Sequence, residues 1–141
     1  MLRNIASILV VDHDRPIRRL PRNTLFLHYR VVEAPTALEA MASLRRDRPD
    51  IVLLELELPD IDGVDLIRKM RAQSQVPIVV LSSRGDEQDK VAALDSGAAD
   101  YVSKPFGTSE LMARIRTALR HPRRDPLRDR ELKPAAPVVP Q

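Results

Sequence analysis

Four short apolar runs of this sequence each end in polar residues that could do chemistry. These residues are Asp12, His13 and Asp14 after the run 8–11, Glu55 after 51–54, Ser82 after 76–81, and Lys104 after 101–103. Carboxylate, hydroxyl and amino groups are the side chains that recognise charged ligands. Each residue alone has an ordinary explanation, such as a helix cap or a turn. At four strand ends of one sheet, however, they would converge, so the sequence predicts one small polar crevice.

The residues between these positions alternate short apolar strands with helices. Continuous apolar runs such as 8–11 and 51–54 are typical of strands buried on both faces. Further strands are predicted at 30–33, 76–81 and 101–103, and helices at about 17–25, 36–44, 64–72, 86–96 and 108–119. Pro21 indicates that the first helix is bent or starts late. Thr36 with Glu39 forms a capping box, and Gly97 ends the fourth helix.

Five successive strand–helix units predict an α/β fold with a doubly wound, five-stranded parallel sheet. Because crossover connections are almost always right-handed, we expect the flavodoxin-like strand order 2-1-3-4-5. Ligands of such sheets bind beyond the carboxyl ends of the strands, beside strand 1. The polar residues described above all belong to that edge.

The composition fits one domain with a short tail. Of the 141 residues 43% are hydrophobic, none is cysteine, and no apolar run approaches the roughly 20 residues that span a bilayer. We therefore expect a cytoplasmic protein with no membrane contact. The segment from Arg120 to Lys133 holds six basic and three acidic residues, which accounts for the whole net charge of +3. We predict a domain over 1–121 and a flexible proline- and charge-rich tail, or truncated linker, over 122–141.

Five motifs resemble those of two-component response-regulator receiver domains. They are Ile-Leu-Val-Val-Asp at 8–12, Pro-Asp-Ile-Asp-Gly at 59–63, Val-Val-Leu-Ser at 79–82, Gly-Ala-Ala-Asp-Tyr at 97–101 and Lys-Pro-Phe at 104–106. The segments 89–95 and 110–116 resemble more closely the OmpR/PhoB class and its KdpE-like potassium-transport regulators. The resemblance covers residues 5–120. It implies a CheY-like receiver that acts in phosphorelay signalling and transcription regulation, and that is not an enzyme.

The resemblance also implies a role for each residue of the crevice. In such receivers an aspartate after strand 3 takes a phosphoryl group from a sensor histidine kinase, and an acidic pair after strand 1 holds Mg²⁺. A serine or threonine and a lysine bind the phosphoryl oxygens. Asp12, Ser82 and Lys104 match this pattern. Glu55 replaces the acceptor aspartate, and His13 replaces the second member of the acidic pair.

These two departures predict an atypical receiver. Glu55 is one methylene longer than aspartate, about 1.5 Å across one carbon–carbon bond, which misplaces it for attack on phosphorus. Glu55 could instead meet Lys104 directly and mimic part of the phosphorylated state. The imidazole of His13 suits Zn²⁺, Ni²⁺ or Cu²⁺ better than Mg²⁺. We therefore expect no cofactor or only weakly bound Mg²⁺, and we favour a hydrogen-bonding His13 at the solvent edge over a transition-metal site with Asp12 and Glu55.

By resemblance, Ser82 and Tyr101 couple the crevice to a face made by the helix 86–96, the strand 101–103 and the helix 108–119. Receivers of the OmpR/PhoB class dimerise through this face. Two of the intersubunit ion pairs survive by position, Lys90 with Glu110 and Asp100 with Arg114, whereas the third would join Ala99 to His121 and is absent. Because exposed ion pairs contribute only about 0–1 kcal/mol, apolar residues such as Val91, Leu94 and Ala113 should matter more. The alternative is that these charges are ordinary solvated surface residues.

Other functions remain open at this stage. The chain could be a conventional kinase-controlled receiver, or a flavodoxin-like ligand-binding protein or enzyme, because a fold does not fix a function. The turn after strand 1 lacks the Gly- or Ser/Thr-rich loop that would cradle a phosphate, which disfavours flavin binding. No helix-turn-helix follows the last predicted helix, so we expect no specific DNA binding by this chain alone. It is either a free-standing receiver or part of a longer regulator.

Overall fold

The computed structural model describes residues 5–13 and 27–120. Its strands are β1 (Ser7–Val11), β2 (Arg30–Ala34), β3 (Ile51–Leu54), β4 (Ile78–Ser82) and β5 (Asp100–Ser103), and its helices are α2 (Ala37–Asp47), α3 (Gly63–Arg71), α4 (Glu87–Ser96) and α5 (Thr108–Arg120). The predicted first helix with Pro21 and the predicted tail over 122–141 lie outside the described residues. No helix of the described part is long and apolar enough to cross a bilayer.

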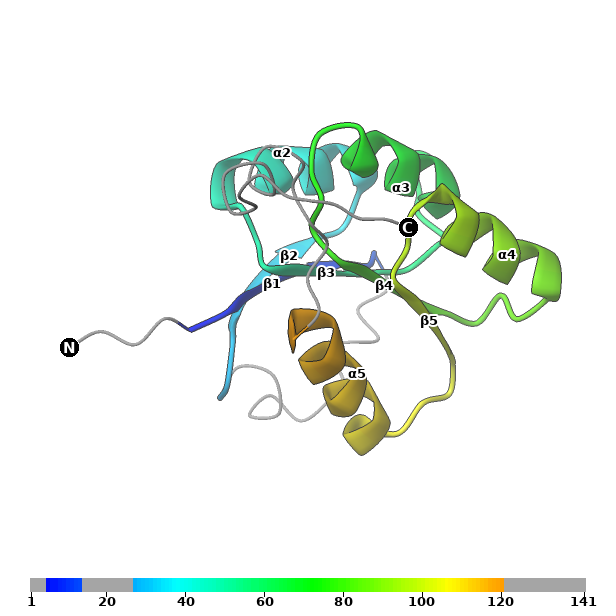
Figure 1. The fold of residues 1–141 in the computed structure, drawn as a ribbon. Helices are drawn as coiled ribbons and strands as arrows, with labels where there is room; N and C mark the ends of the chain where they lie inside the picture. Colours follow the sequence, from blue (N-terminus) through cyan, green and yellow to red (C-terminus); the bar gives the residue numbers. More distant parts are fainter. Residues whose placement is uncertain (1–4, 14–26, 121–141) are drawn as a thin grey trace, which may run out of the picture.

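All described strand pairs are parallel, and the sheet order is β2-β1-β3-β4-β5, which confirms the predicted α/β topology. Helices α2, α3 and α4 cover one face of the sheet, and α5 covers the other (Figure 1). Successive residues of a strand point to opposite faces. Leu9 and Val11 therefore pack into the core under α2–α4, and Ile8 and Val10 into the core under α5. Burial on both faces explains the continuous apolar runs of the sequence.

Local signals in the sequence set the helix ends. The Thr36 hydroxyl accepts a hydrogen bond from the Glu39 N–H at 3.1 Å, which confirms the predicted cap of α2. Asp62 and Asp86 cap α3 and α4 in the same way. Gly97 ends α4 with a φ of +125°, a conformation that L side chains rarely adopt.

Several predicted boundaries shift by one to three residues, and the start of β4 has an identifiable cause. Strand β4 begins at residue 78 rather than at Val76. The Val76 N–H donates to the Ser74 hydroxyl and its carbonyl accepts from Arg71, so its backbone groups are engaged elsewhere. Pro77 has no N–H with which to extend the ladder. The strand instead continues to Ser82, which places that hydroxyl at the edge of the sheet predicted to bind ligands.

Candidate functional site

The carboxyl ends of β3 and β5 meet through an ion pair. The Lys104 ammonium, just beyond β5, donates to Oε1 of Glu55, just beyond β3. Only 7% of the Glu55 side chain and 19% of the Lys104 side chain are exposed. A carboxylate buried to this degree is costly unless it is paired. The observed ion pair confirms the predicted direct contact between Glu55 and Lys104.

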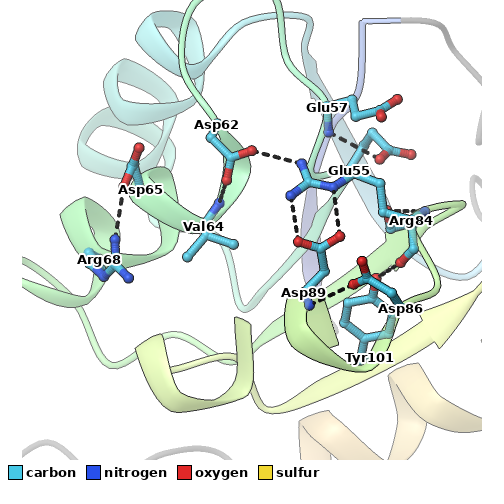
Figure 2. Close-up of polar contacts among 11 residues, drawn as sticks. Glu55, Glu57, Asp62, Val64, Asp65, Arg68, Arg84, Asp86, Asp89 and Tyr101 are labelled. Atoms are coloured by element: carbon cyan, nitrogen blue, oxygen red, sulfur yellow. Dashed lines mark hydrogen bonds and ion pairs between the residues drawn. The ribbon is translucent and has the colours of Figure 1, made fainter. Parts of the chain in front are cut away.

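The second Glu55 oxygen is engaged as well. Oε2 accepts a hydrogen bond from the Glu57 N–H at 3.2 Å, and Figure 2 shows this bond beside the site. The Glu55 backbone is anchored too, since its N–H donates to the Val11 carbonyl at 2.9 Å. The carboxylate is thus oriented from two sides, by a cation and by a backbone donor.

Asp12 lies beside Glu55 at the end of the neighbouring strand. Val11 is paired in register with Leu54, so the two acidic residues follow equivalent positions of β1 and β3. Asp12 is buried, whereas His13 is exposed. Within residues 5–13 and 27–120, no three acidic, histidine or cysteine side chains are grouped so as to hold a metal ion. The less favoured transition-metal site of Asp12, His13 and Glu55 is therefore not assembled in the described part of the chain.

Ser82 and Tyr101 converge on the loop that follows β4. The Ser82 hydroxyl accepts from the Arg84 N–H at 3.0 Å, and the Tyr101 hydroxyl donates to the Arg84 carbonyl. Both Ser82 and Tyr101 are buried. Burial raises the pKa of the Tyr101 hydroxyl. The two residues predicted to communicate are linked through one backbone segment.

The sequence is similar to that of known proteins over most of its length. A model of the response regulator receiver domain matches residues 8–116. The KDP operon transcriptional regulatory protein KdpE of Escherichia coli is 47% identical over 117 residues, which cover 82% of this chain and 52% of KdpE. The transcriptional regulatory protein KdpE of Mycobacterium tuberculosis H37Rv is 44% identical over 117 residues, with the same coverage. The chain belongs to the response-regulator receiver family. The recognised family and class are thereby confirmed.

Solved structures agree with this assignment. The BeF3-activated N-terminal receiver domain of Klebsiella pneumoniae RstA shares 36% identity and a TM-score of 0.76, and the match covers 82% of this chain and 99% of that one. A CheY-like receiver domain from Methanospirillum hungatei shares 27% identity and the same TM-score, over 83% and 95% of the two chains. This receiver chain spans about half the length of the curated relatives that it matches.

The receiver site contains one residue that sequence reasoning missed. The Arg84 guanidinium bonds Asp62 at 2.7 Å and Asp89 at 2.9 and 3.2 Å (Figure 2). Hydrogen bonds from Arg84 to Asp89 and Asp62 raise the pKa of the guanidinium further above its ordinary range. Arg84 lies in a loop with no hydrophobic period, so no pattern in the sequence pointed to it.

On the predicted output face of the receiver, Arg114 has carboxylate partners within its own chain. Arg114 bonds Asp100 at 3.0 Å and Glu110 at 3.3 Å within the same chain. Lys90 is exposed and is not the partner of Glu110 in this chain. The Arg114 guanidinium thus contacts both carboxylates within one chain. The pairing of these residues between subunits remains a prediction.

Proposed function

We propose that this chain is an atypical receiver whose pocket is held by the Glu55–Lys104 ion pair, and that it signals by protein–protein contact rather than by Mg²⁺-dependent phosphorylation. The observation that carries the proposal is the engagement of both Glu55 oxygens, one by Lys104 and one by the Glu57 N–H. Phosphoryl transfer depends on a positioned nucleophile and on cations directed at the phosphoryl oxygens. Here the nucleophile position and the cation neutralise each other.

The ion pair also supports a pocket that resembles the phosphorylated state at all times. A phosphoryl group attached after β3 would bring oxygens toward Lys104, and the longer Glu55 side chain brings its own oxygen there. The substitute carries one negative charge, whereas a phosphoryl group carries about −1.5 to −2. Glu55 thus reproduces the contact with Lys104 but only part of the charge. We infer that the pocket is biased toward its phosphorylated-like form although no phosphoryl group is attached.

His13 supports the loss of the Mg²⁺ requirement. It places an exposed imidazole where the family pattern has a carboxylate. Of the acidic pair after β1, only Asp12 is therefore a carboxylate in this chain. Mg²⁺ demands octahedral oxygen coordination and dehydrates reluctantly. We propose weak or absent Mg²⁺ binding at this edge of the sheet.

The proposed partner surface is the α4–β5–α5 face. Val91 and Leu94 of α4 are 45% and 39% exposed, which offers apolar area for a second copy of the chain. We propose a homodimer there, with Lys90, Asp100, Glu110 and Arg114 at its rim. A sensor histidine kinase is a further possible partner of the intact regulator. Transcription regulation in the cytoplasm is proposed from the KdpE relatives, and specific DNA binding is not proposed for this chain alone.

The deciding experiment is incubation with acetyl phosphate and Mg²⁺, followed by intact-protein mass measurement. The natural chain should gain no phosphoryl group. The matched variant Glu55→Asp/His13→Asp restores the family pattern and should gain one. A natural chain that is phosphorylated on Glu55 would overturn the proposal and favour the conventional, kinase-controlled receiver. A double variant that stays unmodified would show that the two substitutions do not explain the block.

A further inference from the structure

Helix α4 buries little of its own apolar surface. Ala93 is its one buried residue among ten, whereas α3 buries five of nine. Elements with few buried apolar contacts open at low free energy. At the end of the helix, the Gly97 carbonyl accepts from Arg71 at 2.8 Å. The contacts at its start therefore have an unusually large share in fixing its position.

Arg84 makes the principal contacts at that start. Its guanidinium forms two bonds to Asp89, in the first turn of α4, and one to Asp62, the cap of α3. The Arg84 side chain is 24% exposed, and its partners Asp89 and Asp62 are 27% and 42% exposed, so the pair with Asp89 is the better shielded from water. The planar fork of arginine suits such a bridge, and the single ammonium of lysine does not.

The backbone of Arg84 is tied to the pocket on its other side. Its N–H bonds the Ser82 hydroxyl and its carbonyl accepts from Tyr101. The Ser82 carbonyl in turn accepts from the Lys104 N–H at 2.9 Å. Lys104 is the partner of Glu55. An unbroken series of short contacts therefore runs from the acceptor position to the first turn of α4.

We propose that Arg84 is the positioning residue that couples the Glu55–Lys104 pocket to α4, and hence to the face on which α4 lies. The inference rests on the proposed function, because the state of that pocket is what Arg84 would transmit. Contiguity alone does not demonstrate coupling between two sites. The proposal is therefore a claim about non-additivity: loss of the pocket ion pair should reach α4 only while the Arg84 bridge is intact.

The test is amide hydrogen exchange of α4, measured on four proteins: the natural chain, Lys104→Met, Arg84→Ala and the double variant. Lys104→Met breaks the pocket pair and should speed exchange of the α4 amides roughly fivefold, a size typical of residues in one network. In the Arg84→Ala background, where α4 already exchanges faster, the same change should add less than about twofold. A purely structural Arg84 would leave the two effects multiplicative, and that result would overturn the proposal.

Two further variants keep the test decisive. Asp89→Asn cuts the bridge from the α4 side, leaves the Arg84 backbone contacts in place and should reproduce Arg84→Ala if that variant folds poorly. Arg68→Ala is the matched control, since it removes an arginine–aspartate pair at 2.8 Å on α3 that is 60% and 58% exposed (Figure 2). It should leave α4 exchange unchanged, and an effect equal to that of Arg84→Ala would overturn the proposal. Phosphorylation of the natural chain would refute the proposed function and leave these exchange results intact.

Discussion

Loss of the Lys104 charge should destabilise the domain strongly. Lys104→Met keeps most of the side-chain volume but leaves the Glu55 carboxylate, 7% exposed, without its cation. Removing one partner of a buried ion pair costs about 3–5 kcal/mol. Because 19% of the Lys104 side chain is exposed, the lower end of that range, about 3 kcal/mol, is expected. Urea unfolding followed by far-UV circular dichroism measures this as a lower midpoint at constant m-value.

The double variant Glu55→Gln/Lys104→Met isolates the charge. It removes both charges and keeps an amide oxygen for the Glu57 N–H, so it should unfold within about 1 kcal/mol of the natural chain. Arg114→Met is the control, because it breaks a surface pair whose side chains are 42% and 30% exposed; its cost should be about 0–1 kcal/mol. The reasoning fails if Lys104→Met costs no more than this control, or if the double variant is as unstable as Lys104→Met alone.

Two further outcomes test the scaffold around the site. Gly63→Ala should lower the free energy of unfolding by more than about 2 kcal/mol, since an added Cβ would lie 2.5 Å from the Leu56 Cα. Gly85→Ala should cost far less, because a Cβ added there would have no atom within 4 Å. Equal urea midpoints for the two variants would contradict the packing argument. Burial acts to raise the pKa of Asp60, but backbone hydrogen bonds, among them those from the N–H groups of Ala37, Leu38 and Ile61, together outweigh it, so the folded-state pKa is lowered. Asp60 therefore adds stability above its unfolded-state pKa that is lost as pH falls through the folded value, and the stability gap between the natural chain and Asp60→Asn should close on acidification.

The sheet and the pocket were predictable because they depend on pattern. Apolar runs mark buried parallel strands, and parallel strands bring their carboxyl ends to one edge, so Glu55 and Lys104 were expected to meet although 49 positions separate them. Glycine and threonine caps act within a few residues, which explains why the start of α2 and the end of α4 were also predicted well. Each of these features follows from neighbours in sequence or from strand order alone.

The partners of long charged side chains were not predictable in this way. Arg84 bonds one aspartate from the start of α3 and another from the start of α4, elements whose relative placement is a tertiary property. Arg114 likewise bonds two acidic residues of its own chain. A flexible side chain with several carboxylates in reach is placed by the rotamer that packing permits. Charge spacing in the sequence does not specify that rotamer.

The two departures from the family pattern affect different requirements of phosphoryl transfer, the metal charge and the position of the nucleophile. A receiver with an acidic pair and an acceptor aspartate gathers three carboxylates against one lysine, and a divalent cation offsets the excess. In this chain His13 removes one carboxylate, so the four equivalent positions hold two carboxylates, Asp12 and Glu55, and one lysine. His13 therefore lowers the electrostatic demand for Mg²⁺, whereas Glu55 keeps the charge of aspartate and displaces the nucleophile. Glu55→Asp alone would therefore restore the reach of the acceptor but not the metal charge that phosphoryl transfer needs, which is why the proposed reversion changes both residues.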